Sequence, residues 1–284
     1  MTSLKQITDE AFTTGLLGMA AMSVQVSSLM WLRTTLNYQY RYGGTMQQTI
    51  QHLYKDGGLL RFYRGYSAAI LQAPLSRFGD TATNSAILSL LKPYDIPIAV
   101  KTALASTAAG TFRIFLMPID TVKTMMQVEG NHGLNTLRQK LKVKGPSILY
   151  HGSAASSLAT IVGHYPWFTT YNYLNTYLPH YHDKPKQLLR YAFIGFSASF
   201  VSDICSNSIR VVKTTRQTSQ HSITYRQTIQ EILQKDGYVG LFGRGLKTKI
   251  LSNGIQGVLF SVLWNLGQDY YKNKDLKHSI ENKV

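Results

Sequence analysis

Three basic residues recur at a constant interval and could form ion pairs in a low-dielectric setting. Each is followed by a threonine and, four residues on, by a side-chain amide, and successive copies are 90 residues apart. The basic residues are Arg33, Lys123 and Lys213, and the amides are Asn37, Gln127 and Gln217. An acid stands three residues before the base only in the second copy, at Asp120. Charges at such regular positions are suited to pairing between copies of a repeated unit.

Residue sets that carry catalysis are absent from the sequence. The 284 residues contain no paired catalytic carboxylates, no nucleophile beside a base, no metal-ligand cluster and no phosphate-binding loop, so we predict no enzymatic activity, metal or cofactor. The one cysteine, Cys205, excludes an intrachain disulfide, and we expect it to be a small packed hydrophobe. His164, near Pro166, is expected to be a hydrogen-bonded packing histidine rather than a proton-sensitive group.

Six stretches nearly free of charge lie between the basic segments. They occupy residues 11–32, 65–91, 102–119, 145–182, 191–209 and 250–268. Each is about 18 residues or longer, the length at which a helix rising about 1.5 Å per residue crosses about 30 Å of hydrocarbon. Small and polar residues dilute them, so the mean hydropathy is −0.11. Helices that face lipid on one side and an aqueous cavity on the other have such sequences, and six membrane spans are favoured over a soluble helical protein.

A second recurring element divides the chain into three parts. A charged residue and a glycine lead within a few residues to a box that ends in glycine: Asp56-Gly57 to Phe62-Tyr63-Arg64-Gly65, Lys144-Gly145 to Leu149-Tyr150-His151-Gly152, and Asp236-Gly237 to Phe242-Gly243-Arg244-Gly245. We therefore predict three repeats of two spans each, at residues 1–98, 99–187 and 188–284, the last with a polar C-terminal tail. A short amphipathic stretch joins the spans inside each repeat, and the three repeats form one integrated domain.

The segment Pro118-Ile119-Asp120-Thr121-Val122-Lys123, the threefold period and the three boxes together resemble the mitochondrial carrier family over about residues 12–271. The resemblance implies an all-α membrane protein whose six transmembrane helices form a barrel with threefold pseudosymmetry and short matrix-side helices. It also implies a multi-pass protein of the mitochondrial inner membrane. In that family a proline kinks each odd-numbered helix, and acids and bases pair between repeats to close the cavity toward the matrix. Residues 1–10 are too short and too acidic for a cleavable leader, so none is expected.

The first and third repeats depart from the family's pattern at this matrix gate. Ser28 and Ser208 stand where the family has proline, and Met30 and Arg210 stand where it has an acid. Two prolines and two acids are therefore missing. What remains of the gate is Pro118, Asp120, Lys123, Lys213, Arg33 and Arg210.

The cyclic pairing of the family leaves one predicted ion pair, between Asp120 and Lys213. Lys123 loses its acidic partner from the first repeat, and Arg210 brings a like charge to the base of that repeat. A lone intramembrane charge costs about 2.5–3.5 kcal/mol on insertion scales, so the unpaired cations need carbonyls, lipid phosphates or other acids. Asp203, two helical turns before Arg210, is a candidate partner for it.

The cytosolic gate of the family is an aromatic-acid pair followed three residues later by a base. The corresponding residues here carry no charge, and they are Tyr171, Asn172 and Asn175 in the second repeat, Leu263, Trp264 and Gly267 in the third, and residues 84–88 in the first. We expect no ion pair there. Asparagine amides could still bond across the barrel, at about 0.6 to 2 kcal/mol each.

The substrate contacts of the family lie about two turns beyond the glycine of each box. At those positions the candidates for contacts in the cavity are small or polar, namely Gln72, Ala159, Thr160, Ser252 and Asn253. Arg77 and Arg113 are the cationic candidates and would hold an anion. The alternative for them is contact with lipid headgroups or pairing with Asp80.

The boxes themselves resemble the cardiolipin-binding edges of the family. The candidates for binding lipid are Arg64, Gly65, Gly152, Arg244 and Gly245. Each box precedes the expected start of a helix, where anionic headgroups are favoured. Bound cardiolipin is therefore expected.

The net charge indicates an anionic partner. Thirty lysines and arginines against fourteen acids give a formal charge of +16, and either nucleic acid or anionic lipid would match it. The sequence lacks a basic aromatic groove or a known nucleic-acid motif, so anionic lipid at the matrix face is the expected partner and nucleic acid is not.

Two functions compete on this evidence. Loss of most gate pairs favours a carrier fold that no longer transports and serves as an accessory or structural subunit of a larger inner-membrane complex, such as a respiratory complex. The alternative is an atypical solute carrier that exchanges a small metabolite by alternating access, which the fold, the period and the intact second repeat favour. The sequence alone prefers the accessory subunit and leaves any substrate unnamed.

Overall fold

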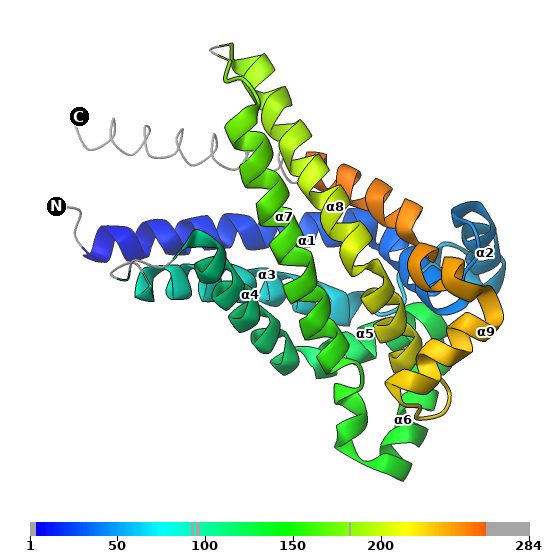
Figure 1. The fold of residues 1–284 in the computed structure, drawn as a ribbon. Coiled ribbons are helices and arrows are strands. Elements are labelled where there is room, and N and C mark those ends of the chain that lie inside the picture. The colour runs from blue at the N-terminus through cyan, green and yellow to red at the C-terminus, as the bar shows by residue number, and fades with distance from the viewer. Residues whose placement is uncertain (1–3, 92–93, 95–96, 182, 260–284) are drawn as a thin grey trace, which may run out of the picture.

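The computed structural model describes residues 4–91, 94, 97–181 and 183–259, and the regular elements in these ranges are helices (Figure 1). The first repeat forms α1 (Leu4–Tyr42), α2 (Met46–Phe62) and α3 (Tyr66–Leu90). The second forms α4 (Ile98–Phe115), α5 (Met117–Glu129), α6 (His132–Lys144), a short 3₁₀ helix η1 (Pro146–Tyr150) and α7 (Ser153–Tyr177). The third forms α8 (Lys184–Thr218), α9 (Tyr225–Gly243) and a helix over residues 246–259.

The long helices close into a ring. Helix α3 packs between α1 and α4, and α7 packs between α4 and α8. The helix over residues 246–259 completes the circle, because Asn253 donates a hydrogen bond to Asp203 of α8, and the backbone carbonyl of Gln256 accepts one from Gln25 of α1 at 2.8 Å. The predicted all-helical barrel is confirmed, and α2, α6 and α9 gather at one end of it (Figure 1).

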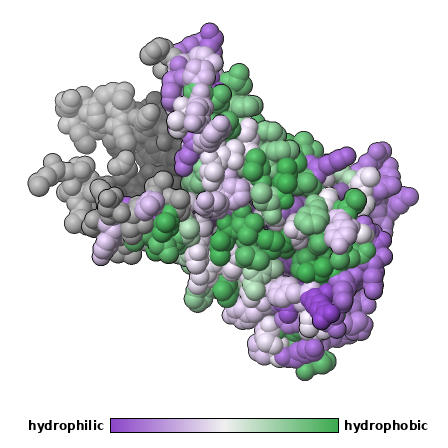
Figure 2. Space-filling view, in the orientation of Figure 1, coloured by the Kyte–Doolittle hydropathy of each residue, from purple (hydrophilic) through white to green (hydrophobic). Residues whose placement is uncertain are grey.

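Apolar side chains cover the middle of one face of the barrel (Figure 2). Figure 2 shows apolar residues over the middle of the visible face and polar residues over the end formed by α2, α6 and α9. Leu188, Phe193, Phe196 and Phe200 of α8 are among the exposed apolar side chains. Within the described residues, α8 from Pro185 is apolar and long enough to cross a membrane alone, and α4 and α5 qualify together as one bent pair.

Cys205 lies on the outer surface of α8. Its side chain is exposed next to exposed Ile204, so the expectation of a packed thiol is wrong. The residue is small and apolar enough to face the same surroundings as its aromatic neighbours on this helix.

The first long helix of each repeat, formed by α1, by α4 with α5, and by α8, differs in how far it bends. The axes of α4 and α5 differ by 69°, and Pro118 occupies the first turn of α5, where its missing N–H costs no hydrogen bond. Helix α1, which lacks the proline, has one non-helical residue at Leu29 (φ −113°, ψ 17°). Helix α8 runs through Ser208 without such a residue. Kinks are therefore found in the repeat that kept its proline and also at Leu29 of α1.

The amphipathic stretches inside the repeats share their local design. Glycines with positive φ interrupt them at corresponding places, Gly58 (+62°) in α2, Gly145 (+71°) after α6 and Gly237 (+62°) in α9. Helices α2 and α9 also begin with capping boxes at Thr45 and Thr224. Each stretch thus turns back toward the ring and delivers the chain to its next long helix.

The last glycine of each box lies against the following repeat. A side chain at Gly65 would lie 3.0 Å from the carbonyl of Lys123, one at Gly152 would meet Gln217, and one at Gly245 would lie 2.9 Å from Leu36. All three residues also have positive φ, +80°, +91° and +68°. Glycine is therefore needed here both for backbone conformation and for close contact between repeats.

Candidate functional site

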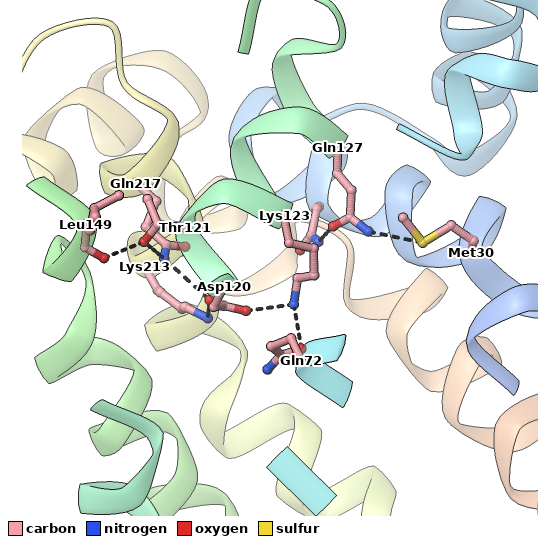
Figure 3. Close-up of polar contacts among 10 residues, drawn as sticks. Met30, Gln72, Asp120, Thr121, Lys123, Gln127, Leu149, Lys213 and Gln217 are labelled. Carbon is pink, nitrogen blue, oxygen red and sulfur yellow. Dashed lines mark hydrogen bonds and ion pairs between the residues drawn. The ribbon is translucent and has the colours of Figure 1, made fainter. Parts of the chain in front are cut away.

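A single carboxylate stands among the residues of the predicted matrix gate. Asp120 is the first-turn acid of α5, and it accepts bonds from Lys123 and Lys213, each with its Nζ 2.6 Å from a carboxylate oxygen (Figure 3). Lys213 comes from α8, so this pair joins the second and third repeats as the sequence predicts. Lys123 also donates to Gln72 of α3 at 3.1 Å. Its missing partner from the first repeat is thus replaced by the acid of its own repeat and an amide.

Amides hold the junction between the first and second repeats. Asn37 of α1 donates to the side-chain oxygen of Gln127 of α5 at 2.5 Å, and Gln127 lies 3.5 Å from the sulfur of Met30. At the second junction Gln217 of α8 donates to the hydroxyl of Thr121 at 3.2 Å. The amides that recur in the sequence therefore contribute hydrogen bonds between repeats at both junctions.

The junction between the third and first repeats has no ion pair between gate residues in the described part of the chain. Arg33 donates from Nη2 to the side-chain oxygen of Gln256 at 2.8 Å, and Arg210 donates from Nε to the hydroxyl of Ser206 at 3.2 Å. A hydrophobic cluster seals this junction next to the arginines; it comprises Leu36, Tyr40, Val211, Val212 and Ile232. Apolar packing therefore joins α1 and α8 at the place where the family's pattern has an ion pair.

The predicted pairing of Asp203 with Arg210 is wrong. Seven residues on one helix correspond to a rise of about 10 Å, and Asp203 instead reaches across to the neighbouring helix. There it accepts a hydrogen bond from Asn253, and Lys249 Nζ lies 4.0 Å from its other oxygen. Asp203 and Lys249 thus tie α8 to the helix over residues 246–259.

A cavity of about 470 Å³ lies within the barrel above the gate. Its walls carry seven cationic side chains, Arg33, Arg77, Arg113, Lys123, Arg210, Lys213 and Lys249. The acids in the same walls are Asp80 and Asp120, which leaves a formal excess of five positive charges. A cavity of this charge attracts anions and repels cations.

Most of the predicted cavity residues line this space. Gln72, Arg77, Arg113, Ala159 and Thr160 are all in its walls. Arg113 is not a free charge, because its Nη2 lies 2.7 Å from Asp80 Oδ2. This bridge between α3 and α4 is the alternative that the sequence analysis gave for Arg113, pairing with Asp80.

The third repeat contributes different cavity residues from those predicted. Ser252 is buried and accepts a hydrogen bond from Gln256, and Asn253 is turned to Asp203. The side chains that this helix contributes to the cavity are instead Lys249 and Gln256. Spacing of three and four residues places all four on one side of the helix, so the sequence gives no sign of which of them a neighbour engages.

A second ring of cations lies at the C-terminal ends of α5, α8 and α1, and the sequence analysis missed it. Arg61 of α2 donates to the carbonyls of Gln127 and Val128 at 2.8 and 2.7 Å. Lys140 of α6 donates to the carbonyl of Gln217 at 3.4 Å, and Arg244 donates to that of Arg41 at 3.0 Å. Each cation therefore caps the C-terminal carbonyls of a helix in the next repeat.

The second ring changes the interpretation of one predicted lipid ligand. Arg244 is buried, and its guanidinium also lies 2.6 Å from Asp236. The prediction that Arg244 binds lipid is therefore wrong.

Lys140, the cation of this ring from the second repeat, has a perturbed pKa. Burial lowers the pKa of its ammonium to about 8, while Glu129 raises it and Arg41 lowers it further.

Toward the other mouth, Asn175 of α7 is bonded to an arginine of α8. Asn175 accepts from Arg190 of α8 at 3.0 Å, and Arg190 also donates to the Asn175 carbonyl at 2.7 Å. This is a bond between neighbouring helices of different repeats, and it uses an arginine that the sequence analysis did not identify. Leu263, Trp264 and Gly267 lie outside the described residues.

His164 lies in the wall of a second hollow of about 690 Å³, which shares Arg77, Asp80 and Gln256 with the first. Its ring packs edge-on against Phe168 with 6.3 Å between ring centres. Among the described residues it has no hydrogen-bond partner, so it is a packing histidine but not the hydrogen-bonded one that was expected.

A family model for "Mitochondrial carrier protein" matches residues 94–182 and 184–275. The chain belongs to the mitochondrial carrier family. The two matched segments cover most of the second and third repeats. Proteins of this family are transporters rather than enzymes, and the predicted recognition of the family is confirmed.

Individual carriers are similar over shorter segments. Human (Homo sapiens) Solute carrier family 25 member 44 is 30% identical over 141 residues, 43% of this chain and 42% of the relative. Protein MITOFERRINLIKE 1, chloroplastic, from Arabidopsis thaliana is 28% identical over 170 residues, 57% of this chain and 40% of the relative. Putative mitochondrial carrier protein PET8 from Saccharomyces cerevisiae is 28% identical over 159 residues, 52% of this chain and 53% of the relative. The matches thus span between two fifths and about half of these relatives.

Proposed function

We propose that the protein is a multi-pass carrier of the mitochondrial inner membrane that exchanges a small anionic solute by alternating access. The observation that carries this proposal is the charge of the cavity, with seven cationic side chains against two acidic ones. Such an excess of cationic side chains inside a membrane barrel is costly, and it is typical of a substrate pathway. The sequence alone prefers an accessory subunit, and the cavity is the reason to reverse that preference.

The gate supports the same function. Its closing bonds are the two contacts of Asp120 and a few amide hydrogen bonds, and each of these bonds can be exchanged for one with a substrate or with water. Amide bonds between membrane helices contribute about 0.6 to 2 kcal/mol each, so anion binding of ordinary strength is enough to shift a gate of this kind.

Exchange in liposomes tests the proposal. The purified protein, reconstituted with an unlabelled anion inside, should take up labelled small mono- and dianions saturably, and it should not take up neutral analogues of the same size. Lys213→Gln, which removes one cavity cation and one gate bond, should reduce uptake at least tenfold. The control is Lys186→Gln, because Lys186 is exposed and pairs with Asp183 only at 3.9 Å. Absence of anion uptake by correctly folded protein would reject a transport function.

An accessory subunit of a larger inner-membrane complex is the second candidate. Two observations favour it: a single carboxylate serves the predicted gate, and Arg210 has no acid within 4 Å among the described residues. Gentle solubilisation followed by a native gel separates the two functions. Migration with a megadalton assembly, together with no uptake in liposomes, would favour the subunit over a carrier of 31.9 kDa that migrates alone.

Anionic lipid such as cardiolipin remains a proposed partner at the boxes of the first and second repeats. Gly152 is the N-cap of α7, and Gly65 directly precedes α3, so each box lies at a helix N-terminus that favours a phosphate. Arg64 is partly exposed and could contact the headgroup. Lipid retained through purification and identified by mass spectrometry would support this partner, and loss of all anionic lipid without any change in stability would reject it.

A further inference from the structure

The junction of the third and first repeats differs from the other two. Cations from both repeats line the cavity there, whereas the second junction has an acid with bases and the first has amides. We propose that a small dianion binds between Arg33, Arg210 and Lys249 and takes the place of the missing gate carboxylate. The ligand class is an oxyanion, either a dicarboxylate or a phosphate. This inference rests on the proposed exchange of anions and assigns a location to the anion in the cavity.

Arg33 presents unsatisfied donors to this place. One amino group of its guanidinium is bonded to Gln256, but the buried Nε has no hydrogen-bond partner in the described part of the chain. A buried donor without a partner costs free energy and is rare in folded proteins. An oxyanion bound in the fork of the guanidinium would satisfy this donor.

Arg210 has its two amino groups available. Its Nε is bonded to Ser206, and among the described residues no hydrogen bond or ion pair is made by its terminal nitrogens. Arg33 and Arg210 both lie in the wall of the 470 Å³ cavity, so an anion that enters the cavity can reach both.

Lys249 completes the site from a third helix. It also lines the cavity, and Arg210, Asp203 and Arg33 all lie within electrostatic range of its ammonium. Its own acid, Asp203, is 4.0 Å away and is shared with Asn253. Three cations and one carboxylate leave an excess of two positive charges, which matches a dianion better than a monovalent ion.

The apolar cluster beside this site explains why the anion would act on the gate. Leu36 and Tyr40 of α1 pack against Val211 of α8, and the hydroxyl of Thr215 donates to the carbonyl of Tyr40 at 3.2 Å. Arg33 and Arg210 both add like charge around Lys249 in the cavity, which opposes this closure, and a bound dianion offsets that charge. The loaded protein should therefore be more stable in the closed arrangement than the empty protein.

Thermal stability of the purified full-length protein tests the site. Succinate and phosphate should raise the melting temperature in a saturable way, beyond chloride at the same ionic strength. Arg210→Glu supplies the missing carboxylate, so it should raise the melting temperature without any dianion and should abolish the response to one. Arg210→Gln should weaken the apparent affinity at least tenfold. The control is Arg138→Glu, which makes the same charge change at an exposed position of α6.

Two results would overturn the site: a wild-type melting temperature that dianions do not raise, or a full response that persists in Arg210→Glu and Arg210→Gln. Parallel uptake measurements keep this site separate from the proposed function. Uptake with an unchanged dianion response in both variants would reject the site and retain the carrier. A response lost in the variants, in a protein that takes up no anion, would retain the site as a structural anion site and reject the carrier.

Discussion

Asp120 is the one acid among the predicted gate residues. Its carboxylate compensates two lysines from different repeats and is almost fully buried, with 8% of the side chain exposed. Removing one member of a buried ion pair leaves the others uncompensated. In the predicted gate one carboxylate therefore compensates the bases, whereas the family's pattern has three acids.

Asp120→Asn should destabilise the protein strongly. The two ammonium groups of Lys123 and Lys213 would then face a neutral amide, and loss of such a partner costs about 3–5 kcal/mol. Thermal unfolding in detergent measures the change. Asp183→Asn is the control, because its exposed contact with Lys186 should contribute about 0–1 kcal/mol. Equal, small effects of the two substitutions would contradict the role given to Asp120.

Lys140 should add a pH dependence to stability at the matrix end. Its pKa is lowered from 10.5 to about 8 by burial, so between these values the unfolded chain binds a proton that the folded chain does not. Stability should therefore rise as the pH is raised from about 8 toward 10.5. Lys140→Gln should lack this rise when melting temperatures are compared across the range. A parallel course for the variant and the wild type would show that Lys140 does not titrate in this way.

At the level of the helices, the boxes act as contacts between repeats. Gly245 begins the turn into the helix over residues 246–259, and its backbone has φ +68°. An added methyl group would lie 2.9 Å from Leu36 and 3.0 Å from Tyr40. The backbone conformation and the contact with the first repeat both exclude a side chain there.

Gly245→Ala should cost more than Gly237→Ala. Both residues have positive φ, so both variants lose about 1–2 kcal/mol from backbone conformation, but a side chain at Gly237 would have nothing within 4 Å. Crowding against Leu36 and Tyr40 should add about 1–3 kcal/mol to the cost at Gly245. The difference between the two melting temperatures isolates the contact between repeats. If the two variants melt together, the box is a turn and not a contact.

The sequence predicts the order of the helices and their repetition better than it predicts their contacts. The proline kink, the three boxes and the Asp120–Lys213 pair follow from residue type and period, because each depends on position along the chain. Asp203 with Lys249, and Asp80 with Arg113, depend on how neighbouring helices are rotated about their axes. Rotation is set by packing of whole helix faces, which a spacing of three or four residues does not determine.

On the scale of the whole molecule, a closed ring of helices encloses a cationic cavity beside a gate of modest strength. The ring is made by contacts around the full circle, and the gate by one carboxylate, several amides and an apolar cluster. An immobile subunit of a complex would need the ring but not the charge excess in the cavity. The central claim is therefore that the cavity opens alternately to the two sides of the membrane.

Side-specific labelling of one cavity residue tests this claim most directly. Ser76 is buried in the cavity wall, and Ser76→Cys in a Cys205→Ser background gives a single thiol there, because Cys205 is the one native cysteine and is exposed. In oriented liposomes a membrane-impermeant maleimide should label this thiol from one side without substrate and from both sides during anion exchange. Labelling from one side only, with every anion that the protein binds, would contradict alternating access.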